Sequence, residues 1–149
     1  MILVDNRKAR AEYEILERFQ AGVELNGAEV KSIRLKSASL QGSFVKVIGQ
    51  ELFLLNAQVT PYKFARQEDI DSRRTRRLLV HRRELIKLQE ITTQKGKTLI
   101  PLSFELAHNL IKLNFAVARG KKQFERKEDI KKRDLKRELG REMKGQRFS

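Results

Sequence analysis

Two segments in the second half of the chain alternate hydrophobic and polar residues. In IKLNFAVARG, the residues at 111, 113, 115 and 117 are large and apolar, whereas Lys112 and Asn114 are polar. This period of two is typical of a strand with one buried face. The segment TLIPLSFEL repeats the pattern and is predicted to place on one face Ile100, Leu102, Phe104 and Leu106. The two strands are expected to pair as a hairpin through AHN, and Pro101 indicates an edge or strand-start position.

Further elements are predicted in the rest of the chain. The segment FVKVIGQELFLLNAQV is expected to form a hairpin that turns at Gly49 and Gln50, and EYEILERF is expected to form an earlier strand. One helix is predicted over AEVKSIRL, after Asn26 and Gly27. A second helix is predicted over HRRELIKLQEITTQ, with Gly96 as a left-handed stop signal.

These patterns favour a mainly β fold with flanking helices. Short antiparallel strands with helices in their connections are typical of a small antiparallel OB-like barrel. A chain of 149 residues with 40% hydrophobic residues can bury one real core, but not two comfortable ones. We therefore expect an OB-like barrel over residues 1–122 and a basic C-terminal tail over residues 123–149.

Charge and composition narrow the class of partner. The formal net charge is +14 and the isoelectric point is about 10.4, which favours a polyanion, nucleic acid first. The absence of cysteine excludes disulfides, thiolate zinc sites and a cysteine nucleophile. No apolar run approaches the roughly 20 residues that span a bilayer, and the N-terminus lacks the hydrophobic region of a signal peptide. The expected location is therefore the cytoplasm.

The C-terminal stretch carries a disproportionate share of this charge. Residues 119–149 contain 13 Lys and Arg but 6 Asp and Glu, with few large apolar residues to offset the entropy of ordering them. The tail is therefore predicted to be disordered when the protein is free. Leu135, Leu139 and Met143 recur every four residues opposite basic residues, which predicts a basic amphipathic helix. Such helices also bind membranes or acidic grooves, but the thin stripe without Trp favours folding on RNA.

A second basic segment lies between the predicted hairpins. The segment KFARQEDIDSRRTRR, residues 63–77, has no clear periodicity and is predicted to be a loop. Its arginines would form a dense guanidinium cluster suited to bidentate phosphate contacts: Arg73, Arg74, Arg76 and Arg77. The alternative is a solvated loop that is neutralised locally by Glu68, Asp69 and Asp71.

Catalytic chemistry is not favoured. His81 precedes a predicted helix and His108 lies in a predicted turn, where capping or solvation is their expected role. The chain has no phosphate-binding glycine loop, zinc-protease motif or nucleophile elbow. The carboxylates of Glu125, Glu128 and Asp129 could chelate a metal, but salt bridges to the many nearby lysines are the simpler interpretation. We expect no enzyme activity, no metal and no cofactor.

The chain also contains five motifs in a characteristic order: NRKARAEYEI, FQAGVELNGAEVKSIR, RRTRRLLVH, TLIPLSF and ARGKKQFERKEDIKKRD. Over about residues 6–135 their order and spacing resemble the SsrA-binding protein (small protein B) family, the bacterial partner of transfer-messenger RNA in trans-translation. The resemblance implies a monomeric OB-like barrel that binds transfer-messenger RNA and delivers it to stalled ribosomes. It also implies a tail that becomes helical in the decoding site and messenger channel, where it meets ribosomal RNA. The remaining alternative is a ribosomal or ribosome-assembly protein with a basic extension.

The same resemblance implies the residues that contact RNA. On the barrel these are Asn6, Arg7, Lys8, Tyr13, Gln20, Gly22, Glu29, Lys31, Arg76, Arg77, Leu79, Gly120, Lys121 and Lys122. In the tail the residues expected to engage the ribosome are Glu125, Arg126, Lys127, Lys131, Lys132, Arg133, Leu135 and Arg137. A core position is an equal alternative for Leu79, and helix solvation is the alternative for Glu29.

Three positions depart from the usual pattern of this family. Gln20 replaces a glutamate, so an amide stands where a carboxylate is usual. The usual Asp-Lys-Arg triplet is Glu125, Arg126 and Lys127, which keeps the charge order but changes reach and fork geometry. Leu135 stands where an aromatic residue is frequent, so apolar docking is expected there instead of stacking.

Overall fold

The computed structural model describes residues 1–61 and 71–120. The tail predicted over residues 123–149 lies outside these ranges, so the predicted division into barrel and tail stays a prediction. The described elements are β1 (Ile2–Asp5), α1 (Arg7–Glu12), β2 (Tyr13–Val23), α2 (Gly27–Arg34), β3 (Ala38–Ser39), β4 (Phe44–Ile48), β5 (Glu51–Leu55), β6 (Gln58–Val59), β7 (Arg76–Leu79), α3 (Arg82–Thr92), β8 (Lys97–Ala107) and β9 (Leu110–Gly120).

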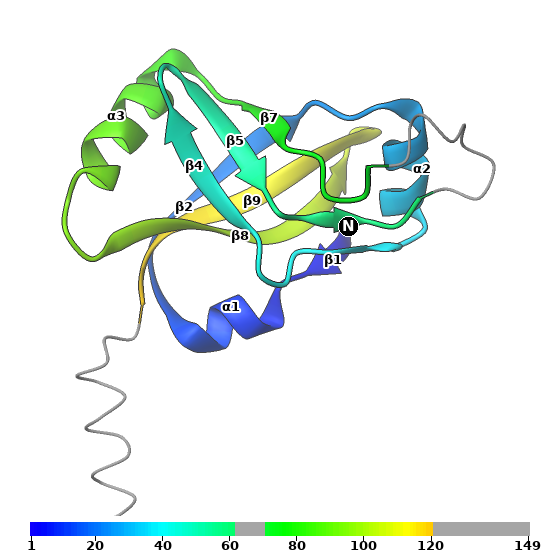
Figure 1. Cartoon of the computed structure of the whole chain (residues 1–149), viewed down its shortest axis with the longest axis horizontal. Coiled ribbons are helices and arrows are strands. Elements are labelled where there is room, and N and C mark those ends of the chain that lie inside the picture. The colour runs from blue at the N-terminus through cyan, green and yellow to red at the C-terminus, as the bar shows by residue number, and fades with distance from the viewer. Residues whose placement is uncertain (62–70, 121–149) are drawn as a thin grey trace, which may run out of the picture.

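An antiparallel sheet that closes on itself forms the body of the molecule. The strand order is β1-β8-β4-β5-β7-β2-β9, and the last strand, β9, also pairs with β8, so the strands from β8 to β9 form a closed ring. Strand β8 pairs with β1 through residues 103–105 and with β4 at Leu99, so these two strands share one of its edges. Helices α1, α2 and α3 lie around the sheet (Figure 1). The predicted mainly β class with flanking helices is confirmed.

The predicted hairpins and both predicted helices are present. Strands β8 and β9 join through His108 and Asn109, whose φ angles of 51° and 63° form a tight turn. Strands β4 and β5 turn at Gly49, with φ of 63°. Asn26 caps α2 by accepting a hydrogen bond from the N–H of Glu29, while Glu29 accepts from the N–H of Asn26. Beyond α3, Gly96 adopts the left-handed conformation with φ of 83°.

The prediction for β8 was wrong in one respect. Ile100 and Leu102 pack in a small cluster beneath α1, whereas Phe104 and Leu106 pack in the main core, so the four residues do not share one face. The pairing with β9 shifts register between Pro101 and Ser103, and a shift of one residue moves the following side chains to the opposite face. Pro101 lies at this bulge in the strand interior, not at an edge or a strand start.

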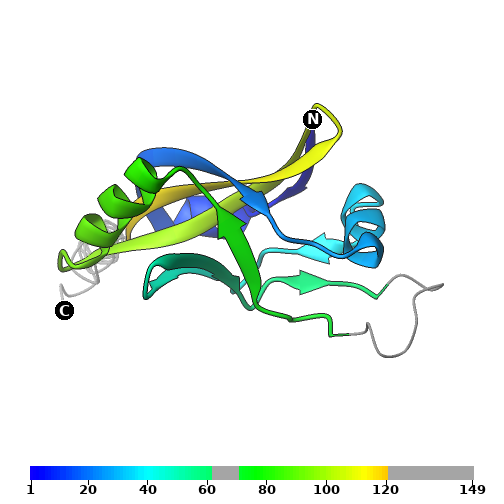
Figure 2. The ribbon, with the colours of Figure 1, turned by 90° about the horizontal axis from the view of Figure 1, so that it is seen from above.

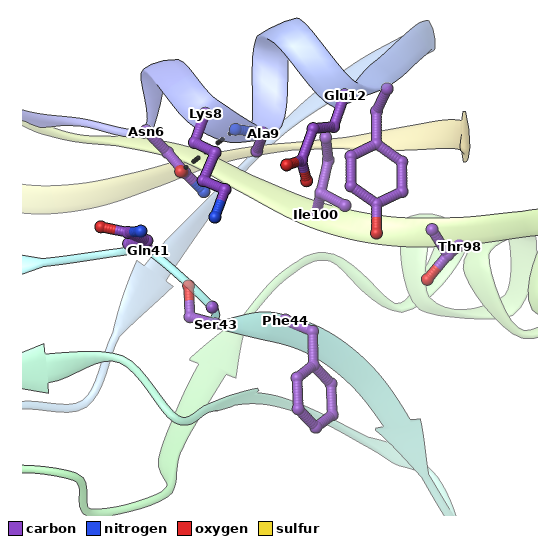
Figure 3. A pocket seen from close by; sticks show the side chains of 11 residues that line it. Asn6, Lys8, Ala9, Glu12, Gln41, Ser43, Phe44, Thr98 and Ile100 are labelled. Carbon is purple, nitrogen blue, oxygen red and sulfur yellow. Dashed lines mark hydrogen bonds between the residues drawn. The ribbon is translucent and has the colours of Figure 1, made fainter. Parts of the chain in front are cut away.

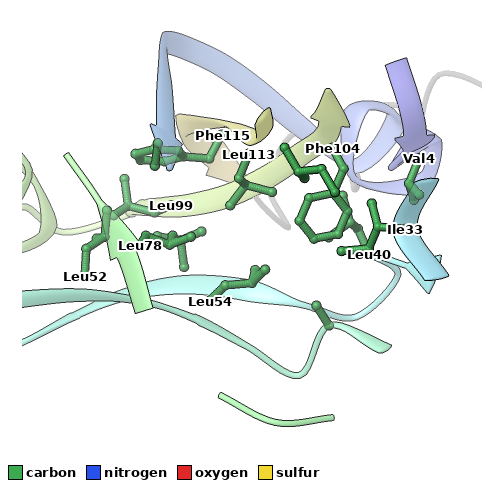
Figure 4. Packing of buried hydrophobic residues seen from close by; sticks show 14 of the residues in the cluster. Val4, Ile33, Leu40, Leu52, Leu54, Leu78, Leu99, Phe104, Leu113 and Phe115 are labelled. Carbon is green, nitrogen blue, oxygen red and sulfur yellow. The ribbon is translucent and has the colours of Figure 1, made fainter. Parts of the chain in front are cut away.

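The main core fills the space between two layers of the barrel. Figure 4 shows Leu52, Leu54 and Leu78 pointing toward Leu113 and Phe115 on the facing layer. Viewed from above, β4 and β5 lie across the core from the β8–β9 hairpin (Figure 2). The outward residues of β4, β5 and β7 consequently point away from this core.

Several short elements were not predicted. Helix α1 has six residues, and the side chain of Asn6 caps it by accepting from the N–H of Ala9. Strand β1 adds to the edge of β8, and β3 pairs with β6 in a separate small sheet. Strand β7 begins at Arg76, so the last two residues of the predicted 63–77 loop belong to the barrel. None of the described helices is long and apolar enough to cross a membrane.

Candidate nucleic-acid interface

The most buried charged group of the described chain is Arg76. Its side chain is 0% exposed and forms an ion pair with Glu29, with Arg76 Nη2 lying 2.6 Å from Glu29 Oε2. The same guanidinium donates to three backbone carbonyls, those of Ala57, Arg74 and Ser72. Arg76 thus joins α2, the chain after β5 and the 72–74 segment, and almost every N–H of its guanidinium has a partner.

Glu29 also forms an ion pair with a second, half-exposed arginine. Arg74 Nη2 lies 2.5 Å from Glu29 Oε1, and the Arg74 side chain is 38% exposed. Arg74 also donates to the carbonyl of Glu24, in the connection between β2 and α2. One carboxylate therefore binds one buried and one half-exposed guanidinium and also belongs to the cap of α2.

The environment of Glu29 favours its charged form. Burial by itself raises the pKa of the Glu29 carboxyl, but hydrogen bonds from Arg74 and Asn26 and the charge of Arg76 outweigh it. The pKa of Glu29 is therefore held below its ordinary value of 4.5. Burial lowers the pKa of Arg76, and Glu29 opposes that effect. An arginine titrates so far above neutrality that the pair remains charged at pH 7.

This lowered pKa predicts a loss of stability in acid. The contribution of Glu29 is fully present above its unfolded-state pKa and is lost as the pH falls through its lower folded-state pKa. We expect the free energy of unfolding of the natural protein to exceed that of Glu29→Gln at neutral pH, with a gap that narrows below about pH 4.5. Urea unfolding of both proteins between about pH 7 and pH 3 measures this gap. A gap that stays constant over the whole range would contradict the assignment.

These contacts occupy the guanidinium of Arg76 inside the fold, so a direct contact of Arg76 with phosphate stays a prediction. The predicted open cluster of four arginines does not form, because successive residues of β7 point to opposite faces. Arg73 donates to Asn56 and Gln58, Arg74 reaches Glu29, and Arg77 lies 3.7 Å from both Glu24 and Glu51. Asp71 accepts a hydrogen bond from the backbone N–H of Arg73, and its negative charge acts to raise the pKa of Arg76. Glu68 and Asp69 lie outside the described residues.

The side chains of Asn6 and Glu29 likewise form hydrogen bonds inside the protein. The amide of Asn6 donates to the carbonyls of Leu40 and Pro101, and its side chain is buried. Glu29 is 6% exposed and accepts the bonds described above, so simple helix solvation does not describe it, and its predicted RNA contact stays a prediction. Both residues position neighbouring segments, and a direct RNA contact by either side chain would require those bonds to break.

A shallow groove brings together three of the residues that the resemblance implied. Gly22 of β2 pairs with Leu79 of β7, and Gln20 lines the same groove. The cavity has a volume of about 450 Å³, and its rim includes His81, Glu84 and Lys112. Leu79 is 48% exposed, which excludes the core position considered for it. A Cβ added at Gly22 would lie 3.4 Å from the Leu79 Cβ, so glycine keeps this groove open.

Gln20 is fixed by a polar network next to this groove. Its amide nitrogen lies 2.9 Å from Glu105 Oε2 and 3.0 Å from Asn114 Oδ1, to which it donates. Asn114 in turn donates to Ser103 and Glu105. A glutamate at position 20 would face the carboxylate of Glu105, whereas the amide found here binds it.

A second pocket is lined by other residues that the family resemblance implied as RNA contacts. Asn6, Lys8 and Tyr13 line a cavity of about 450 Å³ between α1, β8 and the 41–44 turn. Figure 3 shows Lys8 and Glu12 of α1 on one side and Gln41, Ser43 and Phe44 on the other. Gly120 pairs with Tyr13, and a Cβ added at Gly120 would lie 3.6 Å from the Tyr13 ring. This pocket and the Gly22–Leu79 groove share no lining residue.

The other implied residues are distributed around these sites. Arg7 and Lys31 are exposed on α1 and α2, and Arg77 is exposed on β7. Outside the described residues lie Lys121, Lys122 and the tail set Glu125, Arg126, Lys127, Lys131, Lys132, Arg133, Leu135 and Arg137, for which the RNA and ribosome contacts stay predictions.

Some lining residues had not been singled out from the sequence. Lys112 and Phe44 were assigned only to strands, and the strand pattern marks them as outward but does not say what they face. The helix N-cap His81 makes no side-chain capping bond and lines the groove. Within residues 1–61 and 71–120, no group of three or more His, Cys, Asp or Glu residues is placed to hold a metal ion.

Comparison with known proteins identifies the family. The family model described as SmpB protein matches residues 3–145. The chain belongs to the SmpB protein family. An SsrA-binding protein of Chlorobium chlorochromatii is 48% identical over 135 residues, which cover 90% of this chain and 86% of the relative. An SsrA-binding protein of Pelotomaculum thermopropionicum is 46% identical, with coverage of 96% and 94%. The resemblance inferred from the five motifs is thereby confirmed.

A solved structure supports the same family and its fold. It is described as "tmRNA-SmpB: a journey to the center of the bacterial ribosome", and one of its chains is 42% identical to this one. The TM-score is 0.67, and the alignment covers 79% of this chain and 83% of the other. The SmpB relative therefore shares the barrel on which both the groove and the pocket are built.

Proposed function

We propose that this protein binds transfer-messenger RNA and delivers it to stalled ribosomes for trans-translation. The observation that carries the proposal is the match to SsrA-binding proteins over nearly the whole chain, together with a relative solved as tmRNA-SmpB in the bacterial ribosome. The net charge of +14 suits a polyanionic partner. The protein acts in the cytoplasm as a binding protein, without an enzymatic step of its own.

The barrel holds the transfer-RNA-like part of the RNA through the Gly22–Leu79 groove. The lack of a side chain at Gly22 lets an RNA backbone approach the sheet, and the exposed Leu79 offers an apolar contact beside it. Lys112 supplies a cation at the rim, and His81 offers a further polar group. Folded RNA is commonly read in this way, through shape and backbone contacts instead of base sequence. The tail then occupies the messenger channel of a ribosome that has run out of message.

The buried Glu29–Arg76 pair supports this surface from inside. Strand β7 carries Arg76 inward and Leu79 outward, and β7 pairs with β2 at Gly22. The pair fixes the chain immediately before β7 through the carbonyls of Ser72 and Arg74. Both residues therefore affect RNA binding through the position of β7, not through a contact of their own.

Closing the groove is expected to weaken RNA binding. Gly22→Val keeps a residue that suits a strand but fills the space beside Leu79, so we expect affinity for transfer-messenger RNA to fall about tenfold or more. Gly27→Val is the matched control, because a Cβ added at Gly27 meets nothing within 4 Å.

The measurement combines capture from a bacterial lysate with titration of the purified RNA. The natural protein should retain one abundant RNA of a few hundred nucleotides, and the Gly22→Val protein should retain much less of it. Capture of whole ribosomal subunits without that RNA would overturn the proposed function and favour the ribosomal or assembly protein. Equal affinity of the Gly22→Val and natural proteins would remove the groove from the interface.

A further inference from the structure

The outer face of β4, β5 and β7 presents an ordered set of apolar and cationic side chains. Direct pairing aligns Lys46 with Phe53 and Phe53 with Arg77, which places these three side chains in one row across three strands. A neighbouring row pairs Phe44 with Leu55, and Ile48 pairs with Glu51 on the other side. We name this surface the outer platform, defined by Phe44, Lys46, Ile48, Phe53, Leu55 and Arg77.

Burial along the strands establishes that these residues point outward. In β4, Val45 is buried whereas Phe44 and Ile48 are 41% and 48% exposed. In β5, Leu52 and Leu54 are buried in the core, and the intervening Phe53 is only partly buried. Figure 4 shows Leu52 and Leu54 pointing into the core, which leaves the alternate positions on the opposite face.

The charges around the outer platform favour an anionic partner. Lys46 has no ion-pair partner among the described residues, and Arg73 lies at the Phe44 end, where it donates to Asn56. Arg77 is shared loosely by Glu24 and Glu51, at 3.7 Å from each, and its side chain remains 47% exposed. Such exposed pairs are weak and can exchange for phosphate at little cost.

We propose that the outer platform stacks unpaired bases of the same transfer-messenger RNA that occupies the Gly22–Leu79 groove. Aromatic side chains on an open barrel face, with cations beside them, are how single-stranded RNA is bound without sequence readout. The phenyl rings of Phe44 and Phe53 provide the stacking faces, and Lys46 and Arg77 neutralise the adjoining phosphates. Leu79 follows Arg77 on the outward side of β7 and pairs with Gly22, so the outer platform is continuous with the groove.

The arrangement of charge on the outer platform favours RNA over a protein as its partner. Phe53 lies between two cations of its row, Lys46 and Arg77, whereas the apolar centre of a protein interface is depleted of charge. In Figure 3 Phe44 lies on the side of the pocket opposite α1, and its ring points away from that helix. The choice of transfer-messenger RNA rests on the proposed function, whereas the ability to stack unpaired bases does not.

The first test uses a short oligoadenylate that contains 2-aminopurine, whose fluorescence is quenched when the base stacks. We expect the natural full-length protein and Phe53→Tyr to quench it, because both keep an aromatic ring. Phe53→Leu keeps apolar bulk without a ring and should weaken the quenched complex roughly 5- to 100-fold, the range for one stacked base. Leu110→Ala is the matched control, since it truncates an exposed side chain, 58% exposed, in the β8–β9 hairpin. Quenching that is unchanged in Phe53→Leu and in the Phe44→Leu/Phe53→Leu double variant would overturn the proposal.

The second test separates the outer platform from the proposed function. Binding of transfer-messenger RNA by the natural protein tests the function itself, and a selective loss in Phe53→Leu but not in Phe53→Tyr supports the outer platform. If the natural protein binds the RNA normally and Phe53→Leu binds it with equal affinity, the proposed role of the outer platform is wrong, whereas the proposed function is unaffected. Intact RNA binding by Phe53→Leu with impaired binding to ribosomes that lack transfer-messenger RNA would also overturn the proposal, because the partner would then be ribosomal RNA or a ribosomal protein.

Discussion

Arg76→Met is expected to lower the free energy of unfolding by about 3–5 kcal/mol. The side chain of Arg76 is 0% exposed, and its removal leaves the Glu29 carboxylate buried with only Arg74 as a charged partner. It also removes the donors for the carbonyls of Ala57, Arg74 and Ser72. Methionine fills much of the volume, so most of the loss comes from unpaired polar groups, not from a cavity. Urea unfolding followed by circular dichroism at neutral pH measures the change.

Arg74→Met provides the matched control for this prediction. It removes a guanidinium from the same carboxylate, but the Arg74 side chain is 38% exposed, so we expect a smaller loss of stability than for the fully buried Arg76. Glu29→Leu/Arg76→Met should lose less stability than Arg76→Met alone, because no charge then remains buried. Comparable losses in Arg74→Met and Arg76→Met would show that burial does not set the strength of this pair.

Deletion of residues after Gln123 is expected to abolish peptide tagging with little effect on stability. The main core of the described chain reaches only to Val117, and the cluster beneath α1 only to Ala118, so the deletion removes none of these contacts. The melting temperature should therefore barely change. Affinity for transfer-messenger RNA should fall only modestly, because the Gly22–Leu79 groove remains. Tagging on ribosomes stalled without a codon should nevertheless collapse, because nothing is left to occupy the messenger channel.

Two point variants refine this test. Leu135→Pro should impair tagging nearly as much as the deletion, because proline removes a helical hydrogen bond and costs about 3 kcal/mol in a helix interior. Leu135→Ala should be milder, since it loses only an apolar contact. Each variant is assayed for tagging and for RNA affinity in parallel. Full tagging by the shortened protein would reject the proposed role of the tail, and equal losses in both assays would assign the tail to RNA binding instead.

The two candidate sites depend on the buried framework in different ways. The Gly22–Leu79 groove lies on the β2–β7 pair, and the Glu29–Arg76 pair fixes the chain that enters β7. The pocket between α1 and the 41–44 turn depends instead on Asn6, whose amide joins the carbonyls of Leu40 and Pro101. Loss of the Glu29–Arg76 pair should therefore impair the groove more than the pocket. Loss of the Asn6 side chain should impair the pocket more than the groove.

The sequence alone determined the elements whose signals are local. Alternation at 111–117 identified β9, Gly49 identified the turn between β4 and β5, and Asn26 identified the start of α2. These signals succeed because strand period, turn conformation and capping each depend on residues a few positions apart. The family motifs could be identified for the same reason, since order and spacing are properties of the chain itself.

Only the tertiary structure decided which of the polar and apolar residues face solvent. The sequence predicts Arg76 to be a surface cation beside three other arginines. It is buried instead, because it pairs with Glu29, which lies 47 positions earlier in the chain. The sequence predicts a core position and an RNA contact equally well for Leu79. Leu79 is exposed because the neighbouring residue of β7, Leu78, points into the core. The bulge at Pro101 divided β8 between two clusters, which strict alternation does not anticipate. In each case the deciding partner is distant in sequence, and the side of a strand that becomes the interior is fixed only when the barrel closes.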